Sequence, residues 1–155
     1  MKIQRIYVDT SVIGGCFDPE FTVWSNGLMN DFKFKKFKPV ISEIVSEEIV
    51  EAPTFVREKY AELINIGAEC LEVNEEALNL LAQYQIESIL TEKYRNDMVH
   101  IALATIAGVD LLTSWNFKHI VRFDKIRAFN AVNIASGYKT VEIYSPREVT
   151  TYETD

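Results

Sequence analysis

The stretch Ile3-Gln-Arg-Ile-Tyr-Val-Asp-Thr-Ser11 decides how this chain folds. Residues 3–8 are a short, largely apolar run that is rich in β-branched and aromatic side chains, and Asp9 with two hydroxyl residues ends it. This composition is typical of a buried strand that stops at a turn. Asp9 therefore stands at the end of a buried first strand, and the rest of the chain determines what it meets there.

Strands and helices are predicted to alternate after this first strand. Further strands are expected at 39–41, 69–73, 110–115 and 141–144, and helices at 20–36, 42–50, 54–66, 75–90, 97–107 and 120–135. There are no repeats or linkers between them. Such alternation predicts a three-layer α/β/α fold with a mainly parallel central sheet.

Several residues mark where the predicted elements begin and end. Gly14-Gly15 predicts a turn-rich connection after the first strand. Ser42 and Asn96 are candidates for helix N-caps, because their short polar side chains can accept a hydrogen bond from a free amide of the first turn. Gly108 is expected to end the nearly all-apolar helix that precedes it.

Composition places the chain among ordinary globular proteins. It has 155 residues, 48% hydrophobic and 25% charged, which fits one domain with a sizeable core. The two cysteines suit a reducing compartment, and the short apolar N-terminus predicts neither a signal peptide nor a membrane span, so we expect a cytoplasmic protein. The net charge of −7 argues against a basic nucleic-acid-binding face, unless part of the acid binds cations.

Polar residues from distant segments are predicted to meet at one edge of the sheet. Asp9 follows the first strand, Glu47 and Glu48 follow the second by a helical turn, Asp97 begins the apolar helix before the fourth, and Asn116 follows the fourth. In open α/β sheets, ligand sites form beyond the carboxyl ends of the strands. Carboxylates gathered there suit Mg²⁺ or Mn²⁺, which take oxygen ligands and water.

Each acid alone has a simpler explanation. Asp9 is a good turn residue, Glu48 fits a solvated helix face, and Asp97 is favoured in a first turn by the helix dipole. The helix of Asp97 is otherwise apolar, however, so a carboxylate on it needs a partner. The prediction of a site rests on the convergence of these residues.

The motifs as a whole resemble a PIN domain, and VapC-type toxins in particular. Tyr7-Val-Asp-Thr-Ser-Val12 is similar to the opening strand of that family and the acid that ends it, and Ile41-Ser-Glu-Ile-Val-Ser-Glu-Glu-Ile49 is similar to its second motif, with the acid at Glu48. Asn96-Asp-Met-Val-His-Ile-Ala-Leu-Ala104, followed by Leu111-Leu-Thr-Ser114, resembles the third. Val141-Glu-Ile-Tyr-Ser-Pro-Arg-Glu-Val149 resembles the closing strand.

The resemblance implies a PIN-like domain over residues 1–155 that acts as a metal-dependent endoribonuclease. Mg²⁺ (or Mn²⁺) would be held by Asp9, Glu48 and Asp97, and RNA would be the substrate. A cognate antitoxin and a homodimer are the implied partners, with no membrane. Where the family commonly has a fourth acid this chain has Asn116, which is expected to orient water or ligand and leaves the second metal in question.

Other features carry less specific expectations. Thr10, Ser11 and Ser114 are expected to hydrogen-bond the carboxylates. His100 follows Asp97 by three residues on the same helical face, and we expect it to pack and hydrogen-bond in the wall of the site, with a metal ligand or a proton shuttle as the alternative. The segment Phe32-Lys-Phe-Lys-Lys-Phe-Lys38 suits either a helix end with solvated lysines or phosphate contacts. A second basic group is a candidate for RNA-backbone contacts: Lys118, His119, Arg122, Lys125 and Arg127.

Two other functions remain open from the sequence. A catalytically degenerate PIN-fold module would bind RNA or a protein partner without cutting, because Asn116 breaks the acidic set. A phosphotransfer enzyme would use Asp9 as its nucleophile, but such enzymes have a second acid two residues later, where this chain has Ser11.

Overall fold

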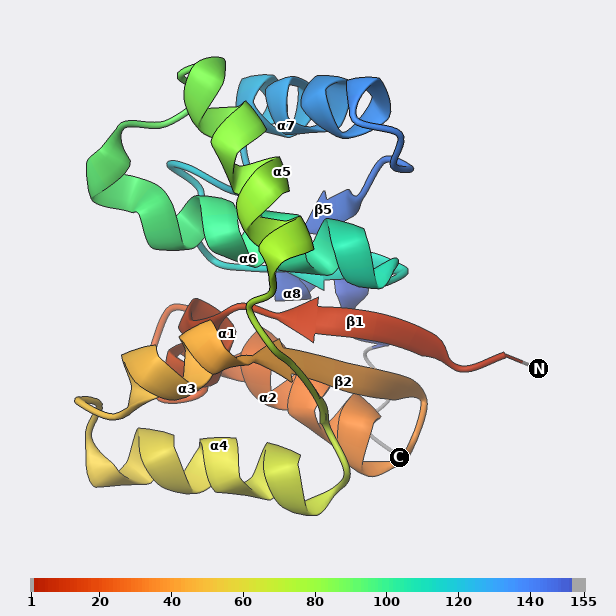
Figure 1. Ribbon diagram of the computed structural model, residues 1–155. Coiled ribbons are helices and arrows are strands. Elements are labelled where there is room, and N and C mark those ends of the chain that lie inside the picture. The colour runs from red at the N-terminus through yellow and green to blue at the C-terminus, as the bar shows by residue number, and fades with distance from the viewer. Residues whose placement is uncertain (1, 152–155) are drawn as a thin grey trace.

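The structure is a computed structural model that describes residues 2–151, with one five-stranded sheet and helices on both faces (Figure 1). The strands are β1 (Gln4–Val8), β2 (Phe37–Ser42), β3 (Glu69–Leu71), β4 (Leu111–Thr113) and β5 (Glu142–Tyr144). The helices are α1 (Thr10–Gly15), α2 (Thr22–Lys33), α3 (Glu43–Ile49), α4 (Thr54–Asn65), α5 (Glu75–Ile86), α6 (Arg95–Ala107), α7 (Phe123–Ala135) and α8 (Pro146–Val149). A 3-10 turn, η1 (Glu92–Tyr94), leads directly into α6.

The sheet has the order β3-β2-β1-β4-β5, and every pairing in it is parallel. The predicted three-layer α/β/α fold with a parallel sheet is confirmed. Strand β1 lies in the middle, with Tyr7 opposite Val40 of β2 and Leu112 of β4. The chain moves from β1 outward to β3 and then returns to the other side of β1 for β4. The carboxyl ends of β1 and β4 are therefore the switch point at which ligands bind in such sheets.

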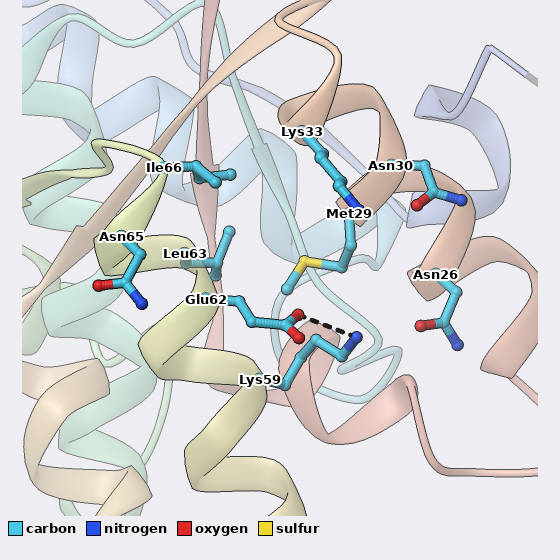
Figure 2. Close-up of a pocket in the computed structure, with 9 residues that line it drawn as sticks. All are labelled: Asn26, Met29, Asn30, Lys33, Lys59, Glu62, Leu63, Asn65 and Ile66. Atoms are coloured by element: carbon cyan, nitrogen blue, oxygen red, sulfur yellow. Dashed lines mark ion pairs between the residues drawn. The ribbon is translucent and has the colours of Figure 1, made fainter.

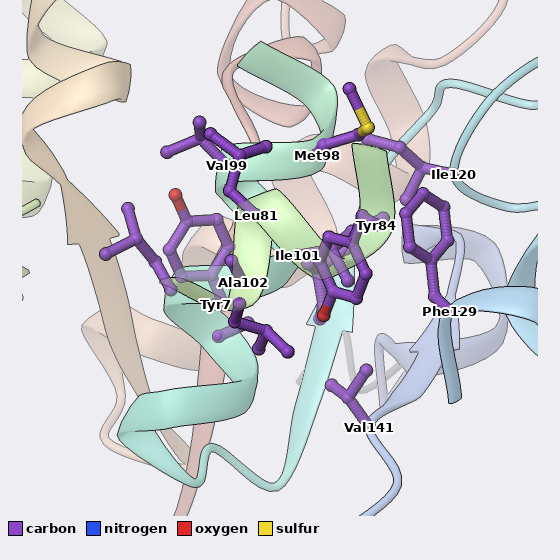
Figure 3. Packing of buried hydrophobic residues seen from close by; sticks show 14 of the residues in the cluster. Tyr7, Leu81, Tyr84, Met98, Val99, Ile101, Ala102, Ile120, Phe129 and Val141 are labelled. Atoms are coloured by element: carbon purple, nitrogen blue, oxygen red, sulfur yellow. The ribbon is translucent and has the colours of Figure 1, made fainter. Parts of the chain in front are cut away.

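Alternation along β1 divides the core into two layers. Ile6 and Val8 pack into a cluster with side chains from α1 to α4, whereas Tyr7 packs into a second cluster with α5, α6 and α7. Successive side chains of a strand point to opposite faces, so a strand covered on both sides is apolar almost throughout. Figure 3 shows Tyr7 in the second cluster together with side chains of α5 and α6, such as Leu81 and Ala102.

Two of the predicted marker positions are wrong, and several elements are shorter than expected, such as α5, which ends at Ile86, and α7, which begins at Phe123. Gly14 and Gly15 are helical residues of α1 and not a turn. A Cβ on Gly15 would lie only 2.6 Å from Trp115 Nε1, so close packing of α1 overrides the low helix propensity of glycine. Asn96 lies inside the first turn of α6, because η1 continues into that helix without a break. The short α8 was not predicted.

Other predicted markers are confirmed. The Ser42 side chain accepts a hydrogen bond from the Ile44 amide and caps α3, and Gly108 ends α6 in the left-handed conformation, with φ of 64°.

None of the helices within residues 2–151 combines the length and the apolar character needed to cross a membrane.

Candidate metal centre

Asp9 lies at the switch point, held by hydroxyl groups from both neighbouring segments. Its amide donates to the Thr113 carbonyl (3.1 Å) and so joins the ends of β1 and β4. Its buried carboxylate accepts hydrogen bonds at Oδ2 from Ser11 Oγ and Ser114 Oγ, both at 2.7 Å. Both donors are on one oxygen, so Oδ1 is left to face the other side chains of the site.

Glu48 reaches the same edge from α3, the helix that follows β2. Its side chain is half-buried, and Oε1 accepts a hydrogen bond of 2.8 Å from Thr10 Oγ1, the first residue of α1. The predicted hydrogen bonds from Thr10, Ser11 and Ser114 to carboxylates are thus confirmed. The unpredicted start of α1 is what places Thr10 against Glu48 and Ser11 against Asp9.

His100 lies between Asp9 and Glu48. It comes from α6, and its buried ring places Nε2 2.7 Å from Glu48 Oε1 and 3.4 Å from Asp9 Oδ1. The other ring nitrogen, Nδ1, is 2.6 Å from the Tyr7 hydroxyl, which is 2.7 Å from Ser42 Oγ. Both nitrogens are therefore engaged, and the ring has a fixed orientation.

Asp97 lies in the first turn of α6 and is bound by two residues of the segment after β4. Its Oδ2 is 3.0 Å from His119 Nδ1 and accepts a hydrogen bond of 3.3 Å from Asn116 Nδ2. The Asn116 Oδ1 accepts the amides of Lys118 and His119. Asn116 thus turns its amide nitrogen toward Asp97 and its oxygen toward the backbone.

The pKa values of Asp97, Glu48 and His100 are shifted in different directions by their surroundings. Burial disfavours ionised Asp97 and the nearby charge of Asp9 adds to this, so its pKa is raised despite the two histidines. Burial works against the charge of Glu48 too, but hydrogen bonds from His100, Thr10 and Asn96 outweigh it and hold its pKa below the usual value. Burial lowers the pKa of His100, but Glu48, Asp9 and Asp97 raise it by more, so the pKa of His100 lies above its ordinary value. The edge is a region of negative potential that favours a cation.

A divalent cation fits this donor set. Within residues 2–151 one group of acid and histidine ligand atoms lies within 4.8 Å of one another, and it consists of Asp9, Glu48 and His100. Ligands at about 2.0–2.3 Å from one ion are about 3–4.5 Å apart, so this group would suit a single ion once the 2.7 Å hydrogen bond between His100 Nε2 and Glu48 Oε1 has opened slightly. Asp97 lies outside that group. Its role as a metal ligand stays a prediction, as do those of Asp9 and Glu48 and the role of Asn116 in orienting water or ligand.

Two residues of this edge were not singled out by the sequence as site residues. The sequence pattern predicts Tyr7 only as a strand residue, although its spacing of two from Asp9 puts both side chains on the same face. His119 was counted with basic residues, yet it bonds Asp97 and packs on Tyr94 with ring centroids 3.8 Å apart. No local pattern marks His119, because its partner Asp97 is far away in sequence.

The side chains of the second basic cluster are mostly in contact with protein groups. Lys118 and Lys93 each place Nζ within 6 Å of the Tyr94 ring centre, beside the acidic edge. The rest of the second cluster has other contacts, with Arg122 bound to Asp124, Lys125 to a carbonyl and Arg127 over a phenyl ring. The segment 32–38 leads into the start of β2, so it lies at the opposite edge of the sheet from Asp9.

A separate pocket of about 300 Å³ lies between α2 and α4 (Figure 2). Met29 and Leu63 supply apolar surface, and Lys59 and Glu62 form an ion pair of 3.1 Å on its wall. None of the predicted site residues lines it. It is a recess on the helical face, distinct from the acidic edge.

The fold and the polar side chains at the carboxyl ends of β1 and β4 define a three-layer α/β protein with a carboxylate–imidazole cluster at the switch point of its sheet. No model of a known protein family matches the chain, and neither does any curated protein sequence. The structure is similar to a chain in the crystal structure of VapBC2 from Rickettsia felis bound to a DNA fragment from their promoter. The identity is 13%, with 91% of this chain and 98% of that chain covered and a TM-score of 0.59. At this identity the similarity establishes the fold, and it supports the predicted PIN-like architecture.

Proposed function

We propose that this chain is a metal-dependent endoribonuclease, the toxin of a toxin–antitoxin pair. The observation that carries the proposal is the gathering of Asp9, Glu48 and Asp97 at the switch point, from three segments far apart in the chain. A structural role alone does not explain why three acids converge where their charges repel. A bound cation removes that repulsion.

The metal of this proposal is Mg²⁺ or Mn²⁺, held by Asp9, Glu48 and Asp97. When bound, such an ion supplies a water of lowered pKa and positive charge beside a phosphate oxygen. The hydroxyls of Ser11, Ser114 and Thr10 orient the carboxylates before anything binds.

RNA is the proposed substrate, and two features beside Asp97 support it. Tyr94 presents a half-buried ring next to His119, and Lys93 and Lys118 lie within reach of the same ring. Aromatic rings stack on bases of single strands and lysines neutralise phosphates. Asn116 holds Asp97 and is proposed to orient water or ligand from the same side.

The partners of this chain are proposed by analogy. The similar chain comes from a structure named VapBC2, and the sequence motifs resemble VapC-type toxins. We propose a cognate antitoxin, a homodimer and a cytoplasmic location on these grounds.

One observation favours a second candidate, a catalytically degenerate module that binds RNA or a protein. The Asn116 oxygen, at the position of a fourth acid, is occupied by two backbone amides. Such a module would retain the RNA-binding surface near Tyr94 but release no product.

Cleavage of a panel of single-stranded and hairpin RNAs, with Mg²⁺, Mn²⁺ or EDTA, tests the proposal. We expect metal-dependent products that Asp9→Asn, Glu48→Gln and Asp97→Asn each abolish. Glu47→Gln is the matched control, because Glu47 is the exposed neighbour of Glu48 and has no contact with the site in the described structure. RNA binding without cleavage would favour the degenerate module, and cleavage that survives Asp9→Asn and Asp97→Asn would refute the nuclease assignment.

A further inference from the structure

His100 lies where a metal ligand would lie. It follows Asp97 by three residues on α6, and so it shares that face of the helix. Its Nε2 is within 3.4 Å of both Asp9 Oδ1 and Glu48 Oε1, whereas Asp97 lies outside the group of ligand atoms within 4.8 Å of one another. Its burial between two carboxylates distinguishes His100 from a histidine on a solvent-exposed helix face.

The support behind His100 resembles that of a ligating imidazole. A histidine that binds metal through one nitrogen normally hydrogen-bonds through the other, which fixes its tautomer. Here Nδ1 meets the Tyr7 hydroxyl, and Tyr7 meets Ser42 Oγ, which also accepts the Ile44 amide at 3.2 Å. All three side chains are fully buried, so this chain of contacts is shielded from water.

The chain of hydroxyls accommodates either tautomer of His100. With the proton on Nε2, that nitrogen donates to Glu48, Tyr7 donates to Nδ1 and Ser42 donates to Tyr7. With the proton on Nδ1, His100 donates to Tyr7 and Tyr7 donates to Ser42. Because Nε2 carries no proton in this tautomer, its lone pair is available to a metal. Both arrangements use the same contacts at 2.6 and 2.7 Å. The ring can therefore offer either a donor or a lone pair at Nε2 without turning, and Glu48 has only to move out of its 2.7 Å hydrogen bond for a metal to take that lone pair.

We propose that His100 binds the metal through Nε2, and that Tyr7 and Ser42 are positioning residues that make this possible. The inference rests on the proposed function only in requiring that a divalent cation bind at this edge. Imidazole nitrogen is a ligand for first-row transition metals, among which Mn²⁺ binds most weakly, whereas Mg²⁺ is a hard ion that takes oxygen ligands. A site with one imidazole and carboxylates thus selects Mn²⁺ over Mg²⁺.

The direct test is pulsed EPR of Mn²⁺ bound to the full chain, which detects a nitrogen nucleus bonded to the metal. The only histidines are His100 and His119. We expect a ¹⁴N coupling in the wild type and in His119→Gln, its replacement by a ¹⁵N coupling on histidine labelling, and its loss in His100→Gln. Bound Mn²⁺ without nitrogen coupling in the wild type would overturn the inference and leave the nuclease proposal standing.

Affinities measured by calorimetric competition give a second readout. Tyr7→Phe keeps the ring in place and removes the partner of Nδ1, so it should weaken Mn²⁺ binding about 10- to 100-fold, as loss of such a partner does, with little effect on Mg²⁺. His100→Gln should lower the ratio of Mn²⁺ to Mg²⁺ affinity at least as much. An unchanged ratio in both variants would refute the role of His100. Failure of the wild type to bind any divalent cation would refute this inference and the metal-dependent nuclease together.

Discussion

Adding one methyl group at Gly15 should damage the fold, whereas the same change at Gly14 should not. Both glycines lie in α1, with ordinary helical backbone. A Cβ on Gly15 would lie 2.6 Å from Ser25 Oγ and from Trp115 Nε1, whereas a Cβ on Gly14 meets nothing within 4 Å. The Trp115 indole is stacked on Phe21 at 4.1 Å and cannot easily move away.

The size of the effect follows from three contributions. Forcing Trp115 aside costs about 1–3 kcal/mol of overpacking. It also breaks the 2.8 Å hydrogen bond from Trp115 Nε1 to Ser25 Oγ, worth about 1 kcal/mol. Alanine regains up to about 1 kcal/mol of helix propensity in either variant. Gly15→Ala should therefore lose about 2 kcal/mol, and Gly14→Ala should gain up to about 1 kcal/mol.

Thermal unfolding followed by circular dichroism measures both variants. For a chain of this length, about 3 °C of melting temperature corresponds to 1 kcal/mol, so we expect Gly15→Ala to melt about 6 °C lower and Gly14→Ala up to about 3 °C higher. The Trp115 amide donates to Ser11 Oγ, which bonds Asp9, so Gly15→Ala should also weaken Mn²⁺ binding. A Gly15→Ala variant as stable as Gly14→Ala would refute the packing argument.

Three further changes test the site. Ser114→Ala removes a hydrogen bond to the Asp9 carboxylate and should lower the free energy of unfolding by about 1.5–3 kcal/mol in urea titrations. Asp9→Asn removes one of the causes that raise the pKa of Asp97, so in ¹³C NMR that pKa should fall toward its ordinary value. Because the wild-type pKa is raised, Asp97 costs stability as pH rises from the ordinary aspartate value through the folded one, and Asp9→Asn should show less of this loss. Lys118→Ala should weaken RNA binding and reduce its salt dependence by about 0.7 in the log–log slope, as for one lost phosphate contact, whereas Lys33→Ala, on the opposite side of the sheet, should leave the slope unchanged.

The sheet could be predicted from the sequence because its strands are buried on both faces. Runs such as Tyr7-Val8 leave a clear apolar pattern, and the acids that follow the runs must lie at one edge once the strands are parallel. The edge was therefore predictable, with Asp9 and Glu48 on it. Helix α1 was not, because Gly15 is explained only by its close packing against Ser25 and Trp115, and Trp115 comes from much further along the chain.

The details of the site depend on contacts that no local pattern contains. His119 meets Asp97 and Tyr7 meets His100 only after the sheet has formed. The orientation of Asn116 is set by two amides that follow it, and this decides whether its oxygen or its nitrogen faces Asp97. Residue type and spacing predict which side chains gather, but not which atom of each faces its neighbours.

The two acids beside His100 differ in how firmly the fold holds them. Asp9 follows the central strand, and its amide is bonded to Thr113, so hydrogen exchange there should require global unfolding. Glu48 lies in the last turn of the seven-residue α3, and helix ends open at much lower cost. Amides around Glu48 should therefore exchange long before that of Asp9. A cation can then enter through brief opening on the Glu48 side, and once bound it should slow exchange in α3 while leaving β1 unchanged.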